Sequence, residues 1–169
     1  NAAVNQAKDN GVTPLYIASQ NGHLEVVLFL VREGNAAVNQ AMDNGVTPLY
    51  IASVMGHLEV VQFLVREGNA AVNQANQNGL TPLCIASGKG HVEIVRFLVR
   101  EGKAAVNQAT TDVGHTPLLA ASRNGNLDQY PHPKPLRSAM TRTMRTLLKC
   151  LTLDRDSPVF KSFERNTVQ

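Results

Sequence analysis

Aromatic side chains are scarce in this chain of 169 residues. It contains no tryptophan, and aromatic residues make up only 5% of it, whereas hydrophobic residues make up 43%. Small aliphatic side chains must therefore fill the interior. Such a composition suits thin layers that pack closely on one another, as in a stacked array that has no single closed core.

Long apolar runs and cysteines are also lacking. The most apolar run, Val26 to Val31, is far shorter than the ~20 residues that a helix needs to cross a bilayer. The two cysteines, Cys84 and Cys150, provide no disulfide framework, and no signal peptide is visible. These absences predict an intracellular, cytoplasmic protein without a membrane span.

One stretch of sequence, Thr13 to Gly34, organises the rest of the chain. It recurs almost unchanged from Thr47 to Gly68 and from Thr81 to Gly102, and its first half returns from Thr116. The copies define units at about 1–34, 35–68 and 69–102, with a partial fourth unit at 103–126. The chain is therefore a repeat protein.

Each unit is predicted to contain two short helices. Thr13 is a good N-cap, Pro14 has the φ angle suited to a first helical position, and the Asn-Gly pair at 21–22 is a stop signal. A second helix is expected from about Leu24 to Arg32, with Gly34 as a left-handed residue at its end.

A short turn is predicted between successive helix pairs. The connection of the first unit contains Asn10-Gly11, and Asn-Gly readily supplies two positive φ values. We therefore expect a tight, hairpin-like finger that projects from the helices.

These motifs together resemble the ankyrin repeat. They are Gly11-x-Thr13-Pro14-Leu15, Gly22-His23-Leu24-Glu25-Val26-Val27 and Val4-Asn5, which recur in fixed order over residues 1–126. The resemblance implies an all-α, ankyrin-type helix-turn-helix repeat solenoid with short hairpin-like fingers.

Two departures from the ankyrin pattern are visible. Where the family has His after Thr-Pro-Leu, this chain has Tyr16, Tyr50, Cys84 and Leu119, so the hydrogen bonds of that His between neighbouring loops are expected to be absent or replaced. The segment 34–39 carries one residue more than the usual spacing, which explains the period of 34 residues and predicts a wider bend.

Within the second helix, the pattern predicts burial on most sides. Position 28 is the exception because it reads Leu28, Gln62 and Arg96 in successive units, which predicts an exposed edge. Leu30, Phe63 and Leu64 are expected in the core.

The histidines of the repeat raise the question of a metal site. Equivalent residues of stacked helix pairs lie about 8–10 Å apart, too far for His23, His57 and His91 to share one zinc ion. We interpret them as structural residues that form hydrogen bonds at the start of the second helix. No phosphate-binding glycine loop and no catalytic triad motif is present, so no enzyme activity, metal, cofactor or small-molecule substrate is expected.

The two ends of the chain differ from the repeats. Residues 1–7 match residues 35–41, so the sequence starts partway through a unit and is interpreted as a fragment whose uncapped end favours self-association or fraying. Residues 127–169 contain Pro131, Pro133 and Pro135 and carry a net charge of +4, against −1 for residues 1–126.

The basic tail at 127–169 contains a candidate amphipathic helix at 138–151, because apolar residues follow helical spacing there. Three interpretations stay open: the helix covers the incomplete fourth unit, the tail is unstructured, or it binds an acidic partner, a membrane surface or a calmodulin-like protein.

The functional prediction rests on the positions that differ between nearly identical units. The first two units differ only at Lys8/Met42, Gln20/Val54, Asn21/Met55 and Leu28/Gln62. Three of these pairs lie at the finger or at the end of the first helix, and the resemblance implies that these places line a concave surface that binds a protein partner. Candidate contact residues are Lys8, Asp9, Asn10, Val12, Gln20, Asn21, Met42, Asp43, Asn44, Val46, Val54, Met55, Asn76, Gln77, Asn78, Leu80, Lys89 and Arg123.

The sequence thus favours a protein–protein interaction scaffold, with no nucleic acid expected as a partner. Two alternatives remain. The chain is the targeting arm of a larger enzyme or channel, or it binds acidic membrane or nucleic-acid surfaces through its basic tail.

Overall fold

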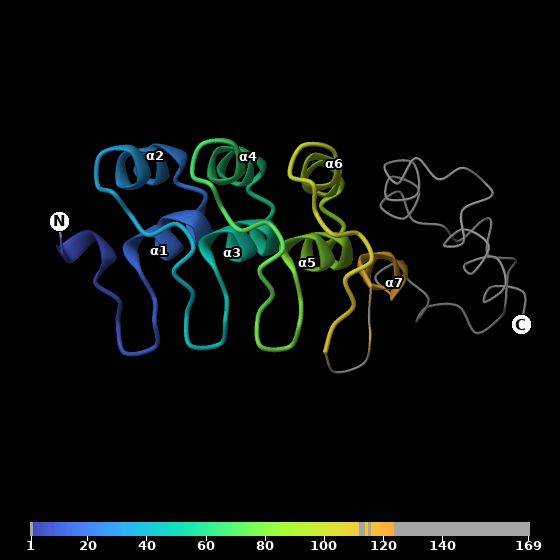
Figure 1. The fold of residues 1–169 in the computed structure, drawn as a ribbon. Coiled ribbons are helices and arrows are strands. Elements are labelled where there is room, and N and C mark those ends of the chain that lie inside the picture. Colours follow the sequence, from blue (N-terminus) through green and yellow to red (C-terminus); the bar gives the residue numbers. More distant parts are fainter. Residues whose placement is uncertain (1, 112–113, 115, 124–169) are drawn as a thin grey trace, which may run out of the picture.

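The chain forms two rows of short helices (Figure 1). The computed structural model describes residues 2–111, 114 and 116–123. The first row contains α1 (Pro14–Asn21), α3 (Pro48–Met55), α5 (Pro82–Lys89) and α7 (Pro117–Arg123), and the second row contains α2 (Leu24–Arg32), α4 (Leu58–Arg66) and α6 (Val92–Arg100). A 3-10 helix, η1 (Ala2–Asn5), precedes them, and the described residues include no strand. The predicted all-α repeat solenoid is confirmed.

The helices of the first row begin and end where the local sequence predicts. The Thr13 hydroxyl accepts a hydrogen bond from the Tyr16 backbone N–H at 3.1 Å, and Pro14 is the first helical residue. Gly22 then ends the helix in the left-handed region with φ of 73°. The same cap recurs at Thr47 and Thr81.

The helices of the second row end differently from the prediction. Asn35, not Gly34, has the positive φ angle of 55°. Gly34 is required for space, because a Cβ atom there would lie 2.8 Å from the carbonyl oxygen of Leu30. Asn5 of the preceding segment holds the left-handed residue, since its side chain donates to the Asn35 carbonyl and accepts from the Ala37 N–H at 2.7 Å.

The fingers also differ from the predicted turn. Of the Asn-Gly pair, only Gly11 has a positive φ, of 81°. The Gly11 N–H donates to the Lys8 carbonyl, and the Lys8 N–H donates to the Val12 carbonyl. This pattern is that of a three-residue hairpin loop closed by a left-handed glycine, not of a two-residue turn.

A continuous apolar core runs between the two helix rows. Leu64 of α4 and Leu98 of α6 are completely buried. Position 28 is less exposed than predicted, because Leu28, Gln62 and Arg96 are half-buried, although 42% of the Arg96 side chain is exposed. On α4 and α6 the exposed residues are instead charged, such as Glu59 and Arg66.

The first unit exposes side chains that the later units bury. Phe29 is 56% exposed and Val26 is 47% exposed, whereas the equivalent Phe63 and Val60 are 6% and 1% exposed. In units two and three the preceding unit covers these side chains. The sequences of α2 and α4 differ only at Leu28/Gln62, so the neighbouring unit decides burial.

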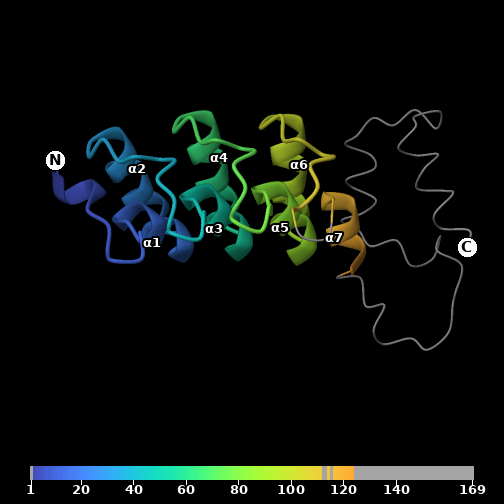
Figure 2. The same cartoon turned by 60° about the horizontal axis from the view of Figure 1, so that its bottom comes forward.

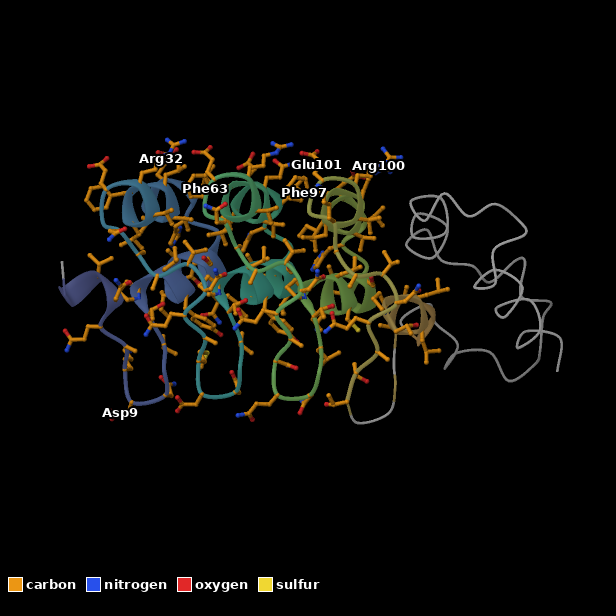
Figure 3. The ribbon with its side chains drawn as sticks, viewed as in Figure 1. Asp9, Arg32, Phe63, Phe97, Arg100 and Glu101 are labelled. Atoms are coloured by element: carbon orange, nitrogen blue, oxygen red, sulfur yellow. The ribbon has the colours of Figure 1, made fainter. Side chains whose placement is uncertain are left out.

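Charged side chains link successive units on the outer side of the second row (Figure 3). Arg32 lies over the Phe63 ring, with its guanidinium carbon 5.4 Å from the ring centroid, and forms an ion pair with Glu67 at 2.7 Å. Arg66 repeats both contacts with Phe97 and Glu101. About half of each charged side chain is exposed, so each pair contributes at most about 1 kcal/mol.

Some sequence predictions lie outside the described residues. They include the array boundary at 126, the basic tail at 127–169 and the candidate helix at 138–151.

Candidate functional site

The candidate site is the finger surface, which we define as the three fingers at 8–12, 42–46 and 76–80 together with the ends of the first-row helices at 20–21, 54–55 and 88–89. The fingers project from the first helix row, on the side away from α2, α4 and α6 (Figure 1). In Figure 2 this side of the molecule is turned toward the viewer.

An apolar cluster joins the fingers to the first-row helices. Tyr50 and Ile51 of α3 are buried in it together with Val46 of the second finger. Half-buried side chains pack against this cluster from fingers and helix ends alike: Val12, Met42, Val54, Leu80 and Ile85. The fingers are therefore held against the helices by apolar contacts.

Backbone hydrogen bonds connect each finger to the next one. The Asp43 N–H donates to the Asn10 carbonyl at 3.3 Å, and the Gln77 N–H donates to the Asn44 carbonyl at 3.0 Å. The fingers approach closely, because a Cβ atom on Gly11 would lie 2.8 Å from the Met42 Cα. A further bond joins the Asn76 amide to the Tyr50 hydroxyl at 3.4 Å. At Tyr50, one of the positions where the family has His, a side-chain hydrogen bond to the next finger is therefore present.

The predicted contact residues divide by exposure. Val46 is only 8% exposed, so it supports the surface from below and is not available for contact. The side chain of Arg123, the last residue of α7, lies outside the described residues. The exposed residues are Lys8, Asp9, Asn10, Asn21, Asp43, Asn44, Met55, Gln77, Asn78 and Lys89, and the half-buried ones are Val12, Gln20, Met42, Val54, Asn76 and Leu80.

Several amide side chains are already used by the fingers themselves. The Asn10 and Asn44 side-chain oxygens accept hydrogen bonds from the N–H groups of Val12 and Val46. The Gln77 amide donates to the Asp43 carbonyl at 2.6 Å. These residues shape the surface, which leaves fewer side chains for contact with a partner.

The middle of the finger surface is apolar, and charges flank it. Met55 at the end of α3 is 49% exposed, and Val54 and Met42 are half-buried near the same cluster. Asp9 lies at the tip of the first finger (Figure 3). No ion pair within the described part of the chain engages Asp9, Asp43 or Lys89.

The isoleucines of the first-row helices were not among the predicted contact residues. Ile17 is 40% exposed, and Ile85 is half-buried against the apolar cluster. A usable signal was present, because Ile51 and Met55 are four residues apart and so share a helix face. The apolar area beneath the finger surface is therefore wider than predicted.

His57 and His91 form structural hydrogen bonds, as predicted, but their partner is different. The His57 Nε2 atom lies 3.0 Å from the Gln20 carbonyl oxygen, and the His91 Nε2 atom lies 3.0 Å from the Val54 carbonyl oxygen. Each ring thus holds the preceding unit and does not cap its own helix. Within the described residues, no three His, Cys, Asp or Glu side chains are grouped so that they could hold a metal ion.

The Tyr50 hydroxyl beneath the finger surface is a weaker acid than an ordinary tyrosine. Burial raises the pKa of Tyr50 to about 12, and the neighbouring Cys84 adds to the rise. Burial also raises the pKa of Tyr16. The folded state therefore favours the neutral phenol over the phenolate.

This pKa shift predicts a loss of stability in alkali. The contribution of Tyr50 is fully present below its unfolded pKa of about 10 and is lost as the pH rises toward about 12. Chemical unfolding at several pH values checks this, with Tyr50→Phe as the comparison, because Phe cannot ionise. The stability of the variant should fall less steeply over this range, and identical slopes would contradict the assignment.

Comparison with known proteins adds one finding. A family model described as ankyrin repeats (3 copies) matches residues 1–76 and 67–129. No curated protein matches the chain. Among the described helices, none has the length and apolar character needed to cross a membrane.

Proposed function

Because the chain belongs to the ankyrin repeat family, we propose that it is a non-enzymatic scaffold that binds another protein through the finger surface. Ankyrin repeats are generally protein-interaction modules, and the family is typically non-catalytic. The specific proposal is that the partner contacts the finger tips and the ends of the first-row helices.

The observation that carries this proposal is the location of the differences between units. The pairs Lys8/Met42, Gln20/Val54 and Asn21/Met55 all lie on the finger surface. In contrast, the contacts between units repeat without change, as in Arg32–Glu67 and Arg66–Glu101. These charged contacts between units are thus constant while the finger surface differs from unit to unit.

The proposed mechanism is rigid display of side chains. Hydrogen bonds between fingers and the apolar cluster beneath them fix the backbone of the surface before a partner arrives. Binding then loses little conformational entropy, which favours affinity. Met55, Val54 and Met42 supply the apolar centre, and the charges of Asp9, Asp43 and Lys89 supply orientation.

The triple variant Met42→Ser, Val54→Ser and Met55→Ser tests the proposal. It should weaken partner binding by more than about tenfold, because apolar anchors near the centre of an interface carry most of its energy. The measurement is quantitative capture of partner proteins from a cell lysate, followed by titration of the captured partner.

The matched control is Gln62→Ser with Arg96→Ser, on α4 and α6 away from the fingers. Thermal unfolding of both variants separates a loss of binding from a loss of fold. Equal capture by the two variants would refute the finger surface as the site. Loss of capture only when residues 127–169 are deleted would move the function to the basic tail.

A further inference from the structure

All three described fingers carry an Asn-Gly pair at the tip. The pairs are Asn10-Gly11, Asn44-Gly45 and Asn78-Gly79, and each asparagine is exposed. In each finger the glycine has a positive φ between 75° and 81°, and its N–H donates to the carbonyl three residues earlier. The backbone of the three turns is therefore nearly the same.

Asn-Gly is also the sequence most prone to deamidation. The backbone nitrogen of the glycine attacks the side-chain carbon Cγ of the asparagine, forming a C–N bond and losing its proton as ammonia leaves. Water then opens the cyclic imide to aspartate or isoaspartate. The attack requires rotation of the asparagine side chain and of its ψ angle, so a hydrogen bond that holds the side-chain amide slows the reaction.

The first two fingers hold this side-chain amide. The Asn10 Oδ1 atom accepts from the Val12 N–H at 3.3 Å, and the Asn44 Oδ1 atom accepts from the Val46 N–H at 3.1 Å. Each bond spans the glycine and ties the reactive side chain to the backbone beyond it.

The third finger lacks this restraint because of Asn76. The Leu80 N–H corresponds to the N–H groups of Val12 and Val46, which donate to the tip asparagines of their own fingers. In the third finger this N–H donates instead to the Oδ1 atom of Asn76, at 3.0 Å. The same oxygen also accepts from the Asn78 N–H. Among the described residues, nothing forms a hydrogen bond with the side-chain amide of Asn78.

We propose that Asn78 is a site of spontaneous deamidation in the folded protein, with Asn76 as the residue that exposes it to the reaction. The equivalents of Asn76 in the other fingers are Lys8 and Met42. Neither has a side-chain oxygen that could accept a hydrogen bond from the N–H group of Val12 or Val46. The bond from the Asn78 N–H restrains the chain before the asparagine, not the side chain that must rotate.

The reaction would change the finger surface in two ways. It places a carboxylate at the third finger, where the described tip carries no charged side chain. The isoaspartate product also lengthens the backbone next to the Asn78 carbonyl, which accepts the Thr111 N–H of the fourth finger at 3.4 Å. The coupling of the third finger to the fourth is therefore lost with time.

Incubation of the folded chain at mildly alkaline pH tests the proposal. Peptide mapping by mass spectrometry follows aspartate plus isoaspartate at positions 10, 44 and 78. The deamidation rate at each site in the folded chain is divided by the rate at the same site in denaturant. This ratio removes the effect of the residue that precedes each asparagine in the sequence. Asn78 should react about 2- to 10-fold faster than Asn10 and Asn44, the factor corresponding to one net hydrogen bond.

Two reciprocal variants identify the cause. Asn76→Met gives the third finger the residue of the second, and it should slow Asn78 to the rate of Asn44. Met42→Asn gives the second finger the residue of the third, and it should speed Asn44 by a similar factor. Equal normalised rates at the three sites in the unmodified chain, or no response to either exchange, would overturn the proposal.

Discussion

Phe63→Ala is expected to lower the free energy of unfolding by about 3–5 kcal/mol. The Phe63 side chain is 6% exposed in α4, packs in the main core and carries the Arg32 guanidinium over its ring. The substitution thus removes buried apolar area and leaves a cavity between two units. Chemical denaturation measures the effect.

The chain provides its own matched control for this prediction. Phe29 occupies the same position in the first unit, and the two helices differ in sequence only at Leu28/Gln62, but Phe29 is 56% exposed. Phe29→Ala should therefore cost less than about 1 kcal/mol. Equal losses at the two positions would show that another surface covers α2 in solution, and sedimentation at several concentrations would then reveal self-association.

A unit added ahead of Asn1 is expected to stabilise the array by about 2–4 kcal/mol. This figure assumes that the added unit buries the exposed half of three side chains, Ile17, Val26 and Phe29, and that each contributes about half of the free energy of complete burial. Residues 1–7 are identical to residues 35–41, so a copy of residues 35–68 placed before Asn1 continues in register. Replacing its Val60 and Phe63 by polar residues turns this unit into a cap.

Thermal unfolding measures the gain, and hydrogen exchange locates it. In the chain without the added unit, protection should be strongest around residues 49–99 and weaker around 15–31, since terminal units have one neighbour fewer. In the capped chain Phe29→Ala should become as damaging as Phe63→Ala. An unchanged midpoint, or strongest protection at 15–31 before capping, would contradict this account of the first unit.

The parts of the fold that could be predicted are those that the sequence specifies locally. The helix starts at Thr13-Pro14 and the stop at Gly22 involve residues a few positions apart. The left-handed Asn35 could not be predicted in this way, because the Asn5 side chain from the preceding unit holds its loop. The same reason applies to His57, which binds the Gln20 carbonyl across the unit boundary.

The candidate site shows the same division. The finger tips and helix ends were predicted as candidate contact residues because the units can be compared position by position in the sequence. The comparison did not show that Val46 is buried or that Gln77 is tied to the neighbouring finger. Those facts depend on how the fingers pack side by side, which no single unit specifies.

The sameness of the contacts between units has a consequence for the gene. Arg32 meets Phe63 and Glu67 in the way that Arg66 meets Phe97 and Glu101, and the Gln20 carbonyl meets His57 in the way that the Val54 carbonyl meets His91. A chain that lost residues 35–68 by unequal recombination would therefore join unit one to unit three through equivalent contacts. Whole units are therefore expected to be removable or addable without redesign of the stack, with a shorter or longer finger surface as the result.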